Sequence, residues 1–156
     1  RDVLMFKFGI NTGLRISDIL NLKVEDVKDR THISIVEKKT GKTKRFFVNE
    51  GLRQDIKNFT EGMADNEYLF QSQKGKNKPI SRVKAYRILN QVADKLGIEE
   101  VGTHTLRKTF GYWHYQKNKD VAVLQEIFNH SSPSITLRYI GINGDMIDKS
   151  LEGFYL

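Results

Sequence analysis

The chain has 156 residues, which is the size of one globular domain with room for a sizeable apolar core. Its 26 Lys and Arg residues outnumber 19 Asp and Glu, and the net charge of +7 favours a polyanionic partner such as nucleic acid. Without cysteine it forms no disulfide or thiolate metal site, and no apolar run reaches the about 20 residues that span a bilayer. We therefore expect a cytoplasmic domain without membrane contact.

Apolar periodicity predicts a mainly α-helical chain with one small antiparallel β-sheet, an α+β fold. In chain order, helices are predicted at 2–13, within 15–22 from an N-cap at Ser17, at 52–59, at 81–97, from 105, at 120–128, at 132–139 and in the C-terminal tail. A β-branched run and "RFFV" flank a turn at Thr40 and Gly41, which predicts a hairpin over 31–49 with lysines at its tip. "EYLF" is expected to be short and extended or irregular.

Small polar residues in front of these runs predict helix N-caps, because their side chains accept backbone N–H groups of the first turn. The predicted N-caps are Ser17, Ser81, Asp120, Ser132 and Asn143, with Pro133 at a first helical position. Gly13 and Gly97 are predicted helix ends. The side chains expected in the core near the C-terminus are Leu106, Phe110, Trp113, Val123, Leu124, Ile127 and Phe128.

Several segments carry residues suited to phosphate chemistry. His104 and Arg107 share a face at the start of a predicted helix, where free N–H groups and a partial positive charge attract anions. Arg15 adds a second guanidinium, and two such groups can hold the oxygens of one phosphate. His130 and Tyr139 occupy "NHSSPSITLRY". His32 and His114 match no motif, and we expect them to be surface residues or hydrogen-bonded core residues.

The segments "TGLRISDIL", "KKTGK", "HTLRKTF" and "NHSSPSITLRYIG", in this order and spacing, resemble the catalytic domain of tyrosine recombinases, the phage integrase family. The resemblance covers essentially the whole chain and implies a helical bundle with a small sheet. It implies that Arg15 and Arg107 grip the scissile phosphate and that His104 shuttles the proton of the nucleophile. It further implies that His130 hydrogen-bonds a phosphate oxygen and that Tyr139 is the nucleophile.

The family also uses a hairpin lysine that protonates the leaving 5′-oxygen. Lys39, directly before Thr-Gly, fits that role best; Lys42 is the alternative, and Lys38 falls on the other strand face under regular pairing.

Two positions depart from the family pattern. Asn129 stands where glycine is common, and asparagine tolerates the left-handed conformation. Lys108 stands where a second histidine often follows, and we assign it no chemistry here.

The implied activity is site-specific DNA recombination, which integrates or excises a phage or mobile element through a 3′-phosphotyrosyl intermediate without metal or other cofactor. A free tyrosine has a pKa near 10, so it needs nearby cations or a base to become a nucleophile. The alternatives are DNA relaxation like that of a type IB topoisomerase, and a DNA-binding module whose catalysis has lapsed. The complete set of six residues speaks against a lapsed module.

We expect residues 1–156 to form a single catalytic domain of a longer integrase, whose N-terminal DNA-binding domains lie outside this chain. The implied partner is double-stranded DNA in a bacterial or phage-infected cell, with expected contacts from Lys38, Lys42, Lys44, Lys74, Lys76, Lys78 and Arg82. Residues 140–156 are expected to form a flexible tail helix with an apolar stripe of Met146, Ile147, Leu151 and Phe154. This stripe docks either on its own domain or on a neighbouring protomer of a tetramer on DNA.

Overall fold

The computed structural model describes residues 1–36, 41–99, 101–102, 104–142 and 144–155. Lys38, Lys39, Thr40 of the predicted turn and the predicted N-cap Asn143 lie outside these ranges. The chain divides into two compact units, residues 1–107 and 108–156. The division falls inside one helix, α6 (Thr105–Asn118).

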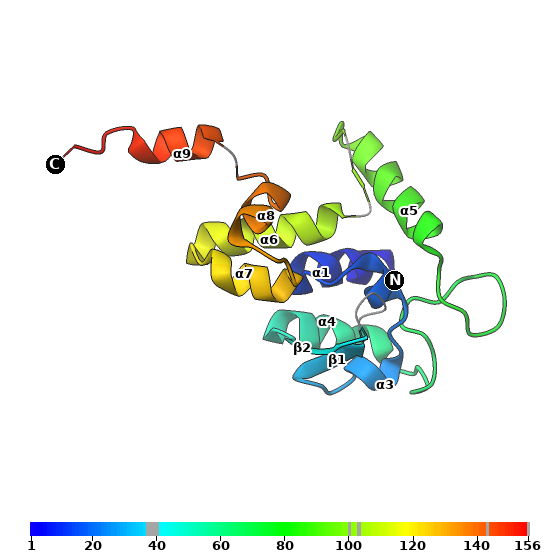
Figure 1. The fold of residues 1–156 in the computed structure, drawn as a ribbon. Helices are drawn as coiled ribbons and strands as arrows, with labels where there is room; N and C mark the ends of the chain where they lie inside the picture. Colours follow the sequence, from blue (N-terminus) through cyan, green and yellow to red (C-terminus); the bar gives the residue numbers. More distant parts are fainter. Residues whose placement is uncertain (37–40, 100, 103, 143, 156) are drawn as a thin grey trace. The chain divides into compact units, whose positions relative to one another are not determined.

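The first unit is mostly helical and contains the predicted hairpin (Figure 1). Its elements are α1 (Asp2–Thr12), α2 (Ile16–Leu20), α3 (Val24–Val27), β1 (His32–Val36), β2 (Thr43–Phe47), α4 (Glu50–Thr60) and α5 (Arg82–Lys95). The two strands pair antiparallel, with His32 opposite Phe47 and Val36 opposite Thr43. The predicted fold class, mainly α with a small antiparallel sheet, is confirmed.

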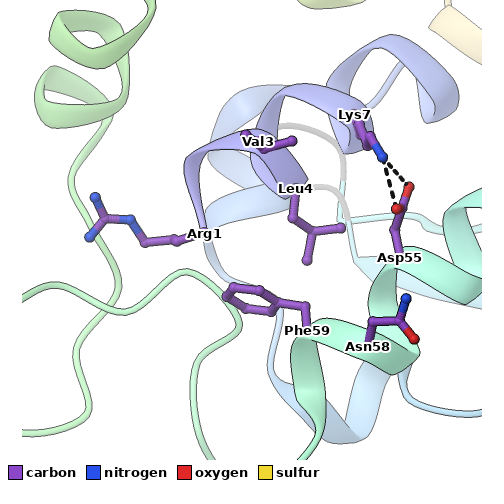
Figure 2. Close-up of a pocket in the computed structure, with 7 residues that line it drawn as sticks. All are labelled: Arg1, Val3, Leu4, Lys7, Asp55, Asn58 and Phe59. Carbon is purple, nitrogen blue, oxygen red and sulfur yellow. Dashed lines mark hydrogen bonds and ion pairs between the residues drawn. The ribbon is translucent and has the colours of Figure 1, made fainter.

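Helix α1 packs against α4 (Figure 1), and its Leu4, Met5 and Phe8 belong to the core of the first unit. Phe8 is fully buried and meets Phe70 edge to face, with ring centroids 6.0 Å apart. At the rim, Nζ of Lys7 pairs with both carboxylate oxygens of Asp55 at 2.8 and 2.9 Å (Figure 2). The pair closes one side of a shallow groove of about 280 Å³ over Leu4 and Phe59.

The N-cap prediction for Ser17 is wrong, because α2 already begins at Ile16. Arg15 is the N-cap residue: its carbonyl accepts the N–H groups of Asp18 and Ile19 at 2.9 and 3.1 Å. Gly13 ends α1 in the left-handed conformation (φ 65°), and this tight reversal starts the next helix before Ser17 is reached. Arg15 is thereby placed directly at a helix N-terminus.

The other described caps follow the sequence prediction. The side-chain oxygens of Ser81, Asp120 and Ser132 accept the N–H groups of Lys84, Val123 and Ile135 at 3.1, 3.1 and 3.4 Å. Helix α4 begins earlier than predicted, at Glu50, and its N-cap Asn49 accepts the Leu52 N–H on Oδ1 at 2.9 Å. Helix α3 has no counterpart among the predicted elements. This single turn is begun by Lys23, whose N–H donates to Asp26 Oδ2 at 2.8 Å.

The second unit contains the rest of α6, then α7 (Val121–Phe128), α8 (Pro133–Tyr139) and α9 (Gly144–Leu151). Its core is built from Leu124, Phe128 and Ile140, with Phe110 and other side chains partly buried against them. A Cβ on Gly111 would lie 2.6 Å from a methyl carbon of Ile140 and 2.7 Å from the Phe128 ring. Helix α6 therefore approaches these side chains closely at Gly111.

Two expected core residues of this unit are exposed. Trp113 is 66% exposed, because it lies about 200° around α6 from Gly111, where the packing contacts are made. Val123 is 44% exposed, since Leu124 and Phe128 occupy the buried face of α7. The stripe of α9 is exposed too, at 60% for Ile147 and Leu151. None of the helices in the described ranges is long and apolar enough to cross a bilayer.

Candidate active site

Arg107 is the buried cation of the first unit. Only 5% of it is exposed, and its Nη1 donates to the carbonyl oxygen of Gly13 at 2.5 Å. Gly13 lies two residues before Arg15, so the bond joins the start of α6 to the segment that carries the other candidate arginine. Arg15 is half-buried at the N-terminus of α2. The structure thus brings both predicted phosphate-gripping segments together.

His104 lies at the beginning of α6, as the sequence predicts. The turn before the helix is formed by Gly102 and Thr105: the Gly102 N–H donates to Thr105 Oγ1 at 2.8 Å, and the Thr105 N–H returns to the Gly102 carbonyl at 3.1 Å. His104 is exposed, whereas Arg107 in the same turn is buried. A titratable ring therefore stands in the positive field of a helix N-terminus, accessible to an anionic ligand.

The second unit brings His130 and Tyr139 together. Their ring centroids are 5.1 Å apart at an interplanar angle of 73°, and Phe128 lies 5.4 Å from each ring. Asn129 permits this arrangement by ending α7 in the left-handed conformation (φ 57°), as expected for the residue that replaces glycine. Both rings are half-buried at the edge of the apolar cluster of α7 and α8.

Two further groups of the second unit contact these rings. Oγ1 of Thr136, which is fully buried, lies 3.0 Å from Nδ1 of His130. Nζ of Lys108 lies over the Tyr139 ring, 5.6 Å from its centroid. Neither residue has a role predicted from the sequence. Helical spacing within α8 places Thr136 near Tyr139, but no sequence signal relates Lys108 on α6 to a ring of α8.

The predicted DNA-contacting residues of the described part lie on three segments of the first unit. Lys42 precedes β2 and is exposed, and Lys44 is half-buried on the strand. Lys74, Lys76 and Lys78 are exposed on a loop closed by a bridge between residues 71 and 79, and Arg82 is exposed at the start of α5. Lys38 and Lys39 fall outside the described residues.

The loop that carries three of these lysines has a defined shape. Asn77 adopts a positive φ of 43°, its Oδ1 accepts the Tyr68 N–H at 2.9 Å, and its Nδ2 donates to the Asn66 carbonyl at 3.1 Å. The Ser72 N–H donates to the Lys78 carbonyl at 2.7 Å. These hydrogen bonds fix the loop backbone, and the lysine side chains are exposed to solvent.

The groove in Figure 2 is not part of the candidate site. It is lined by Arg1, Val3, Leu4, Lys7, Asp55, Asn58 and Phe59, none of which belongs to the four motif segments. Among the described residues, no three His, Cys, Asp or Glu side chains are arranged to hold a metal ion. The candidate residues instead form two sets, Arg15, His104 and Arg107 in the first unit and His130 and Tyr139 in the second.

Comparison with known proteins gives consistent matches along the chain. The probable integrase/recombinase YoeC of Bacillus subtilis is 57% identical over 145 residues, covering 93% of this chain and 80% of that protein. The tyrosine recombinase XerA of Pyrococcus furiosus is 31% identical over 155 residues, covering 97% of this chain and 54% of that protein. The chain thus spans about half the length of the archaeal relative.

Solved structures show the same fold. The XerH site-specific recombinase, in a post-cleavage complex with a palindromic difH substrate, superposes with a TM-score of 0.78 at 23% identity, over 97% of this chain and 45% of that chain. The catalytic domain of bacteriophage HP1 integrase gives 0.61 at 20% identity, over 96% of this chain and 79% of that chain. The family model of the phage integrase family matches residues 1–145. The chain therefore belongs to the phage integrase family of tyrosine recombinases.

Proposed function

We propose that residues 1–156 are the catalytic domain of a site-specific recombinase that cleaves and rejoins DNA through Tyr139. The observation that carries this proposal is the pairing of His130 and Tyr139, 5.1 Å apart at the end of the family match. The XerH structures were solved with difH DNA before and after cleavage, which supports double-stranded DNA as the substrate class. The proposed setting is the cytoplasm of a bacterial or phage-infected cell.

The proposed reaction is a pair of transesterifications. Oη of Tyr139 attacks the phosphorus, the bond to the 5′-oxygen breaks, and a 3′-phosphotyrosyl bond forms. His104 takes the phenolic proton, and a hairpin lysine, Lys39 first and Lys42 as the alternative, protonates the leaving oxygen. The 5′-hydroxyl of a second duplex then attacks the phosphotyrosine and gives its proton to the lysine, the Tyr139–phosphorus bond breaks, and His104 returns the phenolic proton to Oη. Because the number of phosphoester bonds is conserved, the proposal requires neither a nucleotide nor a metal cofactor.

Arg15 and Arg107 are the proposed stabilisers of the negative charge that accumulates on the phosphate in the transition state. The bond from Arg107 to the Gly13 carbonyl supports this role, since it orients one guanidinium before DNA binds. His130 is the proposed donor to a third phosphate oxygen. Oγ1 of Thr136 holds Nδ1 of His130 at 3.0 Å, so that Nε2 is the ring nitrogen left to face the substrate.

The lysine-bearing segments are the proposed phosphate-tracking surface. Lys42 and Lys44 on the hairpin, the lysines of the 71–79 loop and Arg82 would neutralise backbone phosphates, together with Lys38. Their exposure and the held shape of the loop support this assignment. The proposed substrate is the recombination site of a phage or mobile element.

We assign the tail to assembly of a tetramer on DNA. Helix α9 has eight residues, and an isolated helix of that length is marginal in water, so it needs a surface to pack on. Ile147, Leu151 and Phe154 are 60% or more exposed, which supports docking on a neighbouring protomer. Deleting residues 145–156 from the full-length protein should leave single-site binding intact and abolish synapsis, measured by gel shift and light scattering. Normal tetramers and recombinant products would contradict the assignment.

The decisive experiment traps the covalent intermediate on a nicked suicide substrate that carries the native site. Tyr139→Phe should abolish the adduct with almost unchanged DNA affinity, because only the nucleophilic oxygen is removed. Tyr155→Phe is the matched control, since Tyr155 is 95% exposed and should be dispensable. An adduct in Tyr139→Phe would overturn the assignment of the nucleophile. Relaxation of a supercoiled plasmid without recombination sites would favour a topoisomerase-like activity instead.

A further inference from the structure

Lys108 is the first residue of the second unit and extends from α6 over the ring of Tyr139. The remaining ring neighbours described for Tyr139 are Phe128, at 5.4 Å and 69°, and His130, at 5.1 Å and 73°. Both meet it edge to face. The rings of Phe128, His130 and Tyr139 therefore form a cluster with centroids 5.1 to 5.4 Å apart, and a lysine ammonium lies over the ring of Tyr139.

An ammonium group over an aromatic ring is attracted to the negative charge of the π-face. The attraction grows when the phenol loses its proton, because the ring and its oxygen then carry a full negative charge. Tyr139 is partly buried against the apolar cluster that contains Phe128 and Ile140, which lowers the local dielectric on that side of its ring. Lys108 is exposed, so its ammonium remains solvated on the other side.

We infer that Lys108 is a positioning residue for the nucleophile: it orients the Tyr139 ring and stabilises its phenolate, so that cleavage proceeds at neutral pH. The inference rests on the proposed role of Tyr139. Lys108 takes no proton in the step; the phenolic proton goes to His104, and the ammonium stays charged. The bond formed is the phosphotyrosyl bond, and the bond broken is the one to the 5′-oxygen.

A second lysine–tyrosine pair of the same unit provides a matched comparison. Nζ of Lys119 lies 5.3 Å from the Tyr115 ring centroid and also donates to Gln116 Oε1 at 2.7 Å. Tyr115 belongs to no motif and has no histidine ring against it among the described contacts. The geometry of such a pair therefore carries no chemistry by itself. The Lys108 pair differs because the tyrosine under its ammonium group, Tyr139, is the proposed nucleophile.

The test compares single-turnover cleavage by the full-length protein at saturating suicide substrate, between about pH 6 and pH 10. Lys108→Met keeps a side chain of similar length without the charge, and Lys108→Arg keeps the charge. We expect Lys108→Met to be roughly 5- to 30-fold slower at pH 7, with its rate recovering as the pH rises. Lys108→Arg should retain most of the wild-type rate and its pH profile. Lys119→Met should match the wild type.

Two results would overturn the inference. One is an unchanged pH profile of cleavage in Lys108→Met. The other is a defect confined to DNA affinity, with a smaller salt dependence of binding, which would make Lys108 a phosphate contact. Thermal unfolding of each variant separates a folding defect from a catalytic one. Tyr139→Phe in the same assay distinguishes the two proposals. An adduct formed by Tyr139→Phe would contradict the proposed function. An inactive Tyr139→Phe together with a wild-type pH profile for Lys108→Met would contradict only the role of Lys108.

Discussion

The hydroxyl of Thr136 is placed to decide which nitrogen of His130 faces the substrate. It lies 3.0 Å from Nδ1, and it donates to the Ser132 carbonyl one helical turn earlier at 3.4 Å. A hydroxyl can bond to either form of Nδ1, so Thr136 fixes the orientation of the ring and leaves Nε2 for the substrate. Thr136 is fully buried, which keeps water from replacing it.

Thr136→Val should therefore slow cleavage by roughly 10- to 100-fold, part of the effect of losing a whole transition-state donor. The measurement is single-turnover cleavage. Thr60→Val is the matched control, because Thr60 is equally buried and donates to a carbonyl of its own helix. Equal effects of both substitutions would indicate a purely structural role.

Among the elements, α6 leaves no room for a Cβ at Gly111. Gly111→Ala should destabilise the protein by about 1–3 kcal/mol, because the added methyl group overlaps Ile140 and the Phe128 ring. Ile140 directly follows Tyr139, so cleavage should fall as well. Urea unfolding and adduct formation measure the two effects. Gly51→Ala in α4 is the control: its Cβ would meet only Asn49 at 3.6 Å, and it should be neutral or up to ~1 kcal/mol stabilising.

The same helix carries His114, whose Nδ1 has no hydrogen-bond partner among the described residues. In the described part of the chain, Nδ1 of His114 is buried and accepts no hydrogen bond, and the ring packs on Phe110 with centroids 5.5 Å apart. The expectation of a hydrogen-bonded or surface histidine is wrong at this nitrogen. Burial lowers the pKa of His114 from its ordinary value of 6.5, and the charge of Asp120 opposes part of this shift.

The pH dependence of stability follows from that direction. A histidine whose pKa is lower in the folded state binds protons preferentially in the unfolded state. The stability contributed by neutral His114 is complete above pH 6.5 and declines as the pH falls through 6.5 toward the lower folded pKa. Thermal unfolding between about pH 5 and 8 should show this decline in the wild type and a weaker one in His114→Phe. Parallel curves for the two proteins would exclude His114 as a cause.

The sequence predicts those parts of the elements that local chemistry determines. Ser81, Asp120 and Ser132 cap their helices because each satisfies an N–H only three residues away. The prediction that Trp113 is buried is wrong, because periodicity defines an apolar stripe but not which side of the helix its neighbours cover. The prediction that Ser17 is an N-cap is wrong, because the chain reversal at Gly13 starts α2 earlier.

The candidate site, too, has a part that the sequence predicts and a part that it does not. Its residues could be found from their order along the chain, since the motifs are local and their spacing is specific. The contacts of Lys108 with Tyr139 and of Arg107 with the Gly13 carbonyl could not, because the partners are 31 and 94 residues apart. Such contacts depend on how separate helices pack, which single-sequence patterns do not encode.

At the scale of the whole molecule, the charge of +7 predicts binding that weakens steeply with salt. Replacing Lys74, Lys76 and Lys78 together by Gln should reduce the slope of log affinity against log salt by about 0.9 for each phosphate that these lysines neutralise. Fluorescence anisotropy on the full-length protein measures this slope. Replacing Glu61, Asp65 and Glu99 by their amides is the control, since removing exposed acidic groups should not lower the slope. An unchanged slope in the lysine variant would exclude the 71–79 loop from the DNA interface.

The sheet has a consequence for the solubility of the protein. In the part of the chain that the structure describes it has only β1 and β2, so each strand has an outer edge without a strand partner. Such edges promote aggregation between molecules, and Phe47 and Val36, each 62% exposed, would favour it. Lys44 and Arg45 place positive charge on β2, and like charges keep two such edges apart. Alanine at these positions, chosen to weaken DNA contacts, would also remove this protection, whereas glutamate would reverse the charge and keep the repulsion.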